Sequence, residues 1–102
     1  MMKLKYILLL LGTMLLIGCS DKPADVIYKS DCIQCHGKMG LKSALGQSAA
    51  IGGMSAEAIK KALHGYQDGT YGGPKKSIMQ KHAYSLSDSE IEDLAKYISN
   101  LY

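Results

Sequence analysis

The chain contains no phenylalanine, no tryptophan and no arginine in its 102 residues, and all twelve basic side chains are lysines. Without arginine the chain lacks the side chain best suited to reading bases and clamping phosphates, which argues against a nucleic-acid partner. Without Phe and Trp it lacks the bulkiest apolar core residues. A single domain of this size buries only about 60% of its unfolded surface. Such a core needs support from outside the chain.

Reactive side chains gather in one short run, Cys32-Ile33-Gln34-Cys35-His36. A C-x-x-C-H run is typical of covalent c-type haem attachment. Two thiols add across the two vinyl groups of the porphyrin, and the adjacent imidazole reaches the iron as proximal ligand. The run therefore predicts one haem c per chain, held by Cys32 and Cys35 with His36 on the iron. A haem would also fill the aromatic-poor core.

The same run also occurs in zinc sites and in redox-active dithiols, and both stay open as weaker alternatives. A structural zinc site needs four ligands, and the only other imidazoles are those of His64 and His82. There is no second C-x-x-C and no H-x-x-x-H. A thioredoxin-like dithiol normally follows a strand of a βαβ unit, and the sequence has no such pattern.

The start of the chain resembles a bacterial lipoprotein signal peptide. Lys3 and Lys5 form a basic segment, residues 7–17 are largely apolar, and Leu16-Ile17-Gly18-Cys19 resembles a lipobox. A plain signal peptide or an uncleaved anchor helix is the alternative, although the apolar run is short for a membrane span.

The lipoprotein resemblance implies that residues 1–18 are removed, that Cys19 carries lipid, and that residues 19–23 form a lipid-anchored tether. Cleavage would leave 84 residues with ten lysines against nine acids, a formal charge of +1, which further weakens a nucleic-acid function. The protein would be exported and anchored to a membrane, facing the periplasm or the cell exterior. Export also favours haem, because the resemblance implies attachment outside the cytoplasmic membrane.

Three segments carry helical signals, and no strand pattern appears, so the sequence predicts an all-α fold. The first helix is expected from about Pro23 to Asp31. The second is expected over residues 56–64, with Ser55 as N-cap and Gly65 as the C-terminal stop. The third is expected over residues 88–101, behind a Ser87-x-x-Glu90 capping box. Between them, residues 37–53 are rich in glycine and residues 65–86 in turn formers, and both are predicted to be loops.

An electron-carrying haem needs a sixth iron ligand opposite His36. Met79 is the preferred candidate, because it lies far enough along the chain to reach the other face, in the loop before the last helix. His82 is its rival, and His/Met ligation would give a higher potential than a pair of histidines. The remaining candidates are weaker: Met39 lies too close to His36, while Met54 and His64 are more typical of core or surface positions.

Taken together, these motifs resemble a small class I cytochrome c of the bacterial c-553 type. The resemblance is carried by Tyr28-x-x-x-Cys32-x-x-Cys35-His36-Gly37, by Gly69-x-Tyr71-Gly72-Gly73 leading to Met79, and by Leu86-Ser87-Asp88 opening the last helix. It implies a cytochrome c domain over residues 24–102, with three to four helices around one covalently bound haem. The first and last helices would cross, with Ala24 and Tyr97 at the crossing.

The resemblance implies an electron-transfer protein and not an enzyme: a membrane-anchored single-electron carrier in a respiratory chain. Its partners would be redox complexes, such as a quinol-oxidising complex and a terminal oxidase or reductase, and the protein would be a monomer. Four lysines could rim the exposed haem edge and steer an acidic partner, although an ordinary solvated surface position is the better explanation for any single one of them: Lys38, Lys42, Lys75 and Lys76. The alternative is a haem enzyme or gas sensor with an exchangeable sixth ligand, against which Met79 argues.

One departure from the family concerns the proximal histidine. Members often carry a proline near the position of Ala50, in a loop whose backbone carbonyl orients the imidazole. Here no proline lies between Pro23 and Pro74. Which carbonyl receives the His36 N–H is therefore open.

Overall fold

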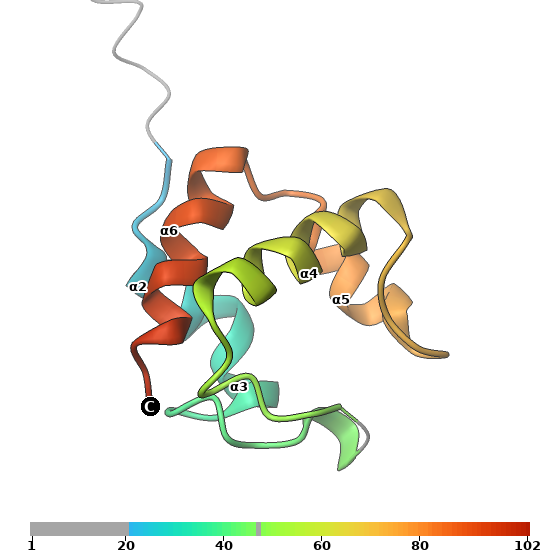
Figure 1. The fold of residues 1–102 in the computed structure, drawn as a ribbon, viewed down its shortest axis with the longest axis horizontal. Coiled ribbons are helices and arrows are strands. Elements are labelled where there is room, and N and C mark those ends of the chain that lie inside the picture. Colours follow the sequence, from blue (N-terminus) through green and yellow to red (C-terminus); the bar gives the residue numbers. More distant parts are fainter. Residues whose placement is uncertain (1–20, 47) are drawn as a thin grey trace, which may run out of the picture.

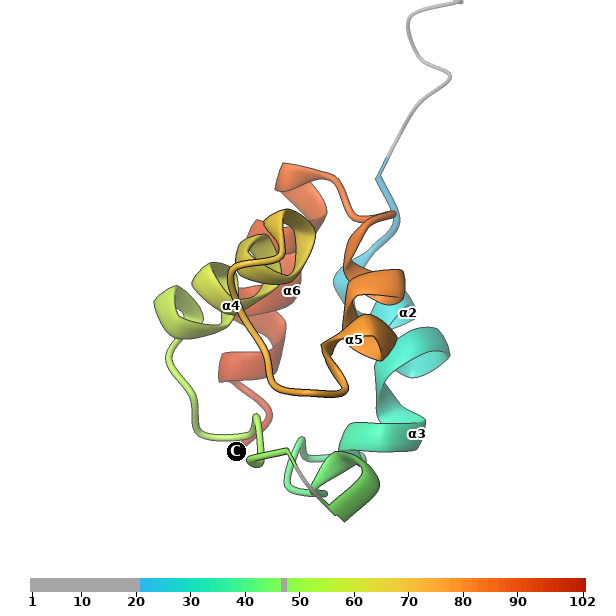
Figure 2. The same cartoon turned by 90° about the vertical axis from the view of Figure 1, so that its right-hand side faces the viewer.

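A computed structural model describes residues 21–46 and 48–102 of the chain. The elements in this part are the helices α2 (Ala24–Ile27), η2 (Tyr28–Cys32), α3 (Ile33–His36), η3 (Ala44–Gly46), α4 (Ala56–Asp68), α5 (Lys76–Ala83) and α6 (Asp88–Ser99) (Figure 1). Over these residues the structure contains no strand, and the predicted all-α fold is confirmed. Turned by 90°, α4 and α6 lie on one side and α5, α2 and α3 on the other (Figure 2). The expected signal peptide and Cys19 lie outside the described residues.

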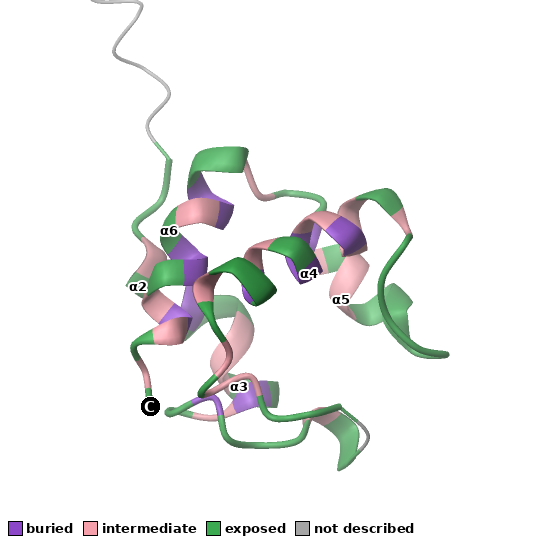
Figure 3. Cartoon of the chain, viewed as in Figure 1, coloured by how far each residue is buried: buried purple, intermediate pink, exposed green. Residues whose placement is uncertain are grey.

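The last helix, α6, is the centre of the core. Its apolar face, Ile91, Leu94, Ala95 and Ile98, is at most 3% exposed and packs against α4 and α2. Figure 3 shows the buried residues on the facing sides of these helices. Where the first and last helices meet, the ring of Tyr97 lies 5.6 Å from that of Tyr28, centroid to centroid. Tyr28 is 1% exposed and supplies the large buried aromatic group at this contact.

The first helical segment extends further than the sequence indicates. We expected it to end near Asp31, but helical structure continues to His36 by way of the π-helical segment η2. In this segment the Ile33 amide donates to the carbonyl of Tyr28, five residues earlier. A π turn accommodates one extra residue and is frequent at functional sites. The C-x-x-C-H run is thus part of the helix that also carries Tyr28.

Helix α4 also runs past its predicted end. The Ser55 hydroxyl caps it as expected, accepting from the Ala58 amide at 3.1 Å. Gly65 does not stop the helix; it is buried within it, and a Cβ there would collide with the side chain of Tyr71. The helix ends instead at Asp68, and its C-cap is Gly69, whose φ of +82° is a left-handed conformation that favours glycine.

The segment predicted as a loop over residues 65–86 contains helix α5, so Met79 lies on a helix and not in a loop. No side chain caps the start of α5, where Lys75 is the N-cap residue. Gln67 of α4 holds the other end, because its side-chain amide donates to the carbonyls of Ala83 and Leu86, both at 2.9 Å. The helix is therefore fixed by a tertiary contact that has no local sequence signal.

Helix α6 begins with the predicted capping box. The Ser87 hydroxyl accepts from the Glu90 amide, and the Glu90 carboxylate accepts from the Ser87 amide, each at 3.0 Å. The same two side chains hold the start of the described chain: Ser87 donates to the Asp21 carboxylate at 2.8 Å, and Glu90 accepts from the Lys22 amide at 3.1 Å. The helix ends at Ser99, two residues before the predicted end. None of the described helices is both long and apolar enough to cross a membrane.

Candidate functional site

A cavity of about 600 Å³ lies among the helices, and it is lined mainly by apolar side chains. Helix α4 contributes Ile59 and Leu63 to its lining, and α6 contributes Leu94 and Ile98. The C-x-x-C-H run and helix α5 complete the lining. The predicted site residues of both segments are therefore brought together around one apolar space.

His36 forms one wall of this cavity from the end of α3. It is 7% exposed, and its Nδ1 has no hydrogen-bond partner among the described residues. Burial lowers the pKa of His36, with a further contribution from the charge of His82. Both effects favour the neutral imidazole, which is the form that binds metals.

The two cysteines of the run lie beside His36 and also line the cavity. Cys32 is half-buried and Cys35 is exposed. Burial, with the charge of Asp31 next, raises the pKa of Cys32 to about 11. Two thiols and an imidazole therefore lie in the lining of one apolar cavity, with one cysteine half-buried and the other exposed.

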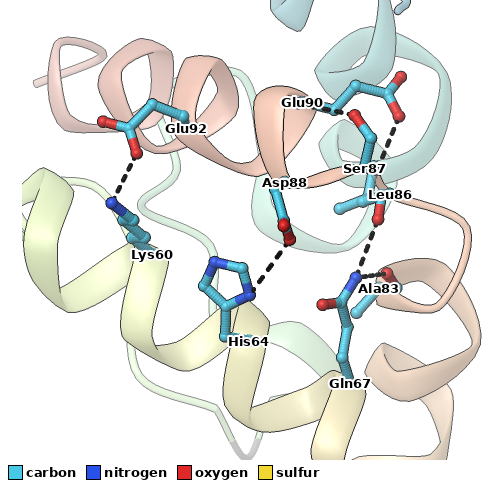
Figure 4. A network of polar contacts seen from close by, with 9 residues as sticks. All are labelled: Lys60, His64, Gln67, Ala83, Leu86, Ser87, Asp88, Glu90 and Glu92. Atoms are coloured by element: carbon cyan, nitrogen blue, oxygen red, sulfur yellow. Dashed lines mark hydrogen bonds and ion pairs between the residues drawn. The ribbon is translucent and has the colours of Figure 1, made fainter.

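Helix α5 forms the other predicted part of the site. Met79 and His82 are three residues apart, so they share one face of the helix, and both are half-buried in the cavity lining. Met54 also lines the cavity. Met39 is 46% exposed and does not line it, and neither does His64, which approaches Asp88 of α6 at 4.0 Å (Figure 4). The structure thus joins Met79, His82 and Met54 to the run, and leaves Met39 and His64 outside.

Of the four lysines expected at the rim, Lys75 and Lys76 line the cavity. Lys42 instead reaches back to the Gln34 carbonyl, with its Nζ at 3.4 Å, and Lys38 is exposed away from the lining. A positive rim is therefore present on the α5 side.

An aromatic pair at the cavity was not predicted. Tyr66 of α4 and Tyr71 pack edge to face with their ring centroids 5.1 Å apart, and both line the cavity. Burial raises the pKa of Tyr66. Tyr71 belongs to the family-like loop motif. Tyr66 lies beyond the predicted end of its helix, so its place on the apolar face of that helix was not predicted. The half-buried ring of Tyr66 and the more exposed ring of Tyr71 supply part of the apolar surface that Phe and Trp would give.

The residues present fit a haem. The cavity offers an apolar interior for a flat ring, two thiols at one edge, and nitrogen and thioether donors on different elements. The buried imidazole without a partner at Nδ1 is a further sign that its surroundings are arranged for a ligand. Within the described chain, no three His, Cys, Asp or Glu side chains gather into a group that could hold a metal ion by themselves.

Comparisons with known proteins point the same way. The family model described as cytochrome c matches residues 22–102. Cytochrome c-553 of Nitratidesulfovibrio vulgaris is 44% identical over 75 residues, which cover 74% of this chain and 72% of the relative. Cytochrome c-553 of Desulfomicrobium norvegicum is 45% identical over 71 residues, covering 70% and 86%. Cytochrome c-553 of Helicobacter pylori is 41% identical over 70 residues, covering 69% and 70%.

Proposed function

We propose a function from the premise that this chain belongs to the cytochrome c family, and so is an electron-transfer protein that carries covalently bound haem c. The finer assignment is that Cys32 and Cys35 attach the ring, and that His36 and Met79 are the axial ligands of the iron. It is supported by one observation above all: the C-x-x-C-H run and the α5 face that carries Met79 line the same apolar cavity.

When bound, the haem supplies an iron that gains and loses one electron. The protein's own residues set the conditions for this exchange. His36 is buried, and burial lowers its pKa and so favours the neutral imidazole, which can donate to the metal. A thioether from Met79 favours ferrous iron, because soft sulfur stabilises the reduced state. Leu63, Leu94 and Ile98 exclude water from the interior, while Lys75 and Lys76 attract an acidic partner to the rim.

The same proposal includes the N-terminal segment. Residues 1–18 are a lipoprotein signal peptide, Cys19 carries lipid, and residues 19–23 tether the domain of residues 24–102 to a membrane. The protein is then an exported monomer facing the periplasm or cell exterior, and it passes single electrons in a respiratory chain. Its donor and acceptor are membrane complexes, such as a quinol-oxidising complex and a terminal oxidase or reductase. The support is the basic, apolar and lipobox-like order of the first nineteen residues.

Mass spectrometry of the denatured mature protein tests the haem sites. We expect an added mass of one haem that survives denaturation, and its complete loss in the Cys32→Ser/Cys35→Ser variant. A wild-type protein without the added mass, or a double variant that keeps it, would contradict the assignment. The ferric spectrum tests the sixth ligand, since the methionine-to-iron charge-transfer band should be present in the wild type.

A separate measurement tests the anchor. The N-terminal peptide of protein from bacterial membranes should begin at Cys19 and carry acyl chains. The Cys19→Ala variant should lack acyl chains and leave the membrane fraction. An unmodified Cys19 in the wild type would remove the anchor from the proposal and leave the haem assignment untouched.

A further inference from the structure

A closed cycle of three hydrogen bonds surrounds the C-x-x-C-H run. The Ile33 amide donates to the Tyr28 carbonyl across the π turn, and the Gly37 amide donates to the Ile33 carbonyl at 2.8 Å. The Tyr28 hydroxyl then donates to the Gly37 carbonyl at 2.5 Å and closes the cycle. The first two bonds join backbone atoms and would form with any side chain at position 28. The third bond requires the phenol.

The ring of Tyr28 is held in place by the core, so its hydroxyl has a fixed position. Its side chain is among the largest fully buried ones, and its ring lies against Tyr97 in the contact between the first and last helices. Burial raises the pKa of the Tyr28 hydroxyl, so it is a protonated donor at neutral pH. Since the ring is held by the core, the hydroxyl holds Gly37 against the core as well.

The residue that receives this bond directly follows His36. Gly37 ends α3 with a φ of +80°, a conformation that favours glycine, and the chain then turns back so that the Lys42 amide donates to the His36 carbonyl at 3.0 Å. The His36 side chain has no bond of its own at Nδ1 within the described residues. The direction of the imidazole therefore depends on the backbone that carries it.

We propose that Tyr28 is a positioning residue for His36, acting through the bond from its hydroxyl to the Gly37 carbonyl. The proposal rests on the proposed role of His36 as iron ligand. In metal sites the groups around a ligating histidine commonly fix its ring orientation through a bond to the imidazole itself. In this chain the backbone on the C-terminal side of the histidine is fixed instead, by a phenol from the preceding turns of the same helical segment. Loss of the hydroxyl leaves the core ring in place and lets the imidazole plane turn.

Tyr28→Phe in the haem-loaded protein tests this inference, with Tyr97→Phe as matched control. Tyr97 belongs to the same ring pair, and its hydroxyl makes no hydrogen bond within residues 21–46 and 48–102. The haem methyl resonances of the ferric protein report the orientation of the axial imidazole. We expect them to shift and broaden in Tyr28→Phe and to keep their wild-type positions in Tyr97→Phe. Unchanged resonances in Tyr28→Phe, or equal shifts in both variants, would overturn the proposal even if both variants lose stability.

A measurement on the wild-type protein covers the case in which Tyr28→Phe does not fold. In the ferrous protein the Tyr28 hydroxyl proton should exchange slowly with water and show a cross-peak to the Gly37 α protons. A rapidly exchanging hydroxyl without this cross-peak would rule out the bond. The role of His36 as iron ligand and the role of Tyr28 can be tested separately. If the wild type lacks iron-shifted His36 ring resonances, His36 is not the ligand. If these resonances are present and Tyr28→Phe leaves the haem methyl resonances unchanged, only the role of Tyr28 is refuted.

Discussion

The C-x-x-C-H run and helix α5, which carry the two sets of predicted iron ligands, are held in different ways. His36 is buried, and its neighbours are tied by backbone bonds and by the Tyr28 hydroxyl. Helix α5 has eight residues, of which only Ala83 is buried, and it has no side-chain cap at its start. Its main anchor is Gln67, at its C-terminal end. The backbone next to His36 is thus tied at several points, whereas α5 is held mainly from one end, and we expect the proposed ligand on α5 to be the easier one to exchange.

Replacing Met79, the proposed sixth ligand on α5, should cause the largest change in iron coordination. In Met79→Ala we expect the methionine-to-iron charge-transfer band to disappear, while the haem stays six-coordinate because His82 lies on the same face of α5. The midpoint potential should fall, within the range of about 0.8 V over which axial ligands set haem potentials. Absorption spectra and redox titration measure both changes.

The double variant Met79→Ala/His82→Ala should be five-coordinate and high-spin, and His64→Ala should match the wild type because His64 lies outside the cavity. A charge-transfer band that survives in Met79→Ala would show that Met79 is not the ligand. A low-spin six-coordinate spectrum in the double variant would show that another side chain, such as Met54 in the cavity lining, can bind the iron.

Removing Gln67, the anchor of α5, should have a smaller effect, and this effect should be limited to the binding of Met79. Gln67→Ala leaves the carbonyls of Ala83 and Leu86 without their side-chain donor, and Ala83 is fully buried. The Ala83 carbonyl keeps the Leu86 amide as a donor at 3.1 Å. The variant therefore loses two ordinary hydrogen bonds, each with a net contribution of about 0.5–1.5 kcal/mol. We expect the charge-transfer band to be lost at a lower temperature than in the wild type, with the haem methyl pattern set by His36 unchanged below that temperature. Gln80→Ala, on α5 itself, is the control. If both variants lose the band at the same temperature, Gln67 is not the anchor of α5.

Weakening helix α6 should have the smallest effect, and it should affect the C-x-x-C-H run and helix α5 equally. Ser87→Ala removes the N-cap of α6 and the bond to Asp21, and loss of an N-cap typically costs about 1 kcal/mol. The denaturation midpoint should fall, while the native charge-transfer band and methyl resonances stay unchanged. Ser89→Ala, exposed on the same helix, should leave the midpoint within error. A spectral change in Ser87→Ala would mean that α6 positions an iron ligand directly.

The elements predicted well are those whose signals are local. Ser55 and Ser87 cap α4 and α6 as expected, because an N-cap and the apolar period behind it lie within a few residues of each other. Helix α5 escaped prediction because it lacks such a cap and depends on Gln67, a residue of another helix. Gly65 was misjudged because a buried close contact with Tyr71 and a helix stop both select glycine.

The candidate site shows the same division. The spacing of Cys32, Cys35 and His36 is enough to predict haem attachment, because the reacting groups are neighbours in the chain. The bond from Tyr28 to Gly37 could not be read in the same way, since an apolar-face tyrosine at helical spacing looks like an ordinary core residue. The π turn between Tyr28 and Ile33, which lies between the two partners of this bond, has no sequence signature of its own.

The bonds that join Asp21 and Lys22 to Ser87 and Glu90 span 66 and 68 positions, and they have a consequence for the order of folding. Synthesis proceeds from the N-terminus, so the C-x-x-C-H run is complete long before α6 exists. Until then Tyr28 has no last helix to pack against, and the closure of so long a loop is entropically costly. Cys32, which is half-buried in the fold, therefore stays accessible until helix α6 is made, and a haem attached through it would be enclosed only at that stage.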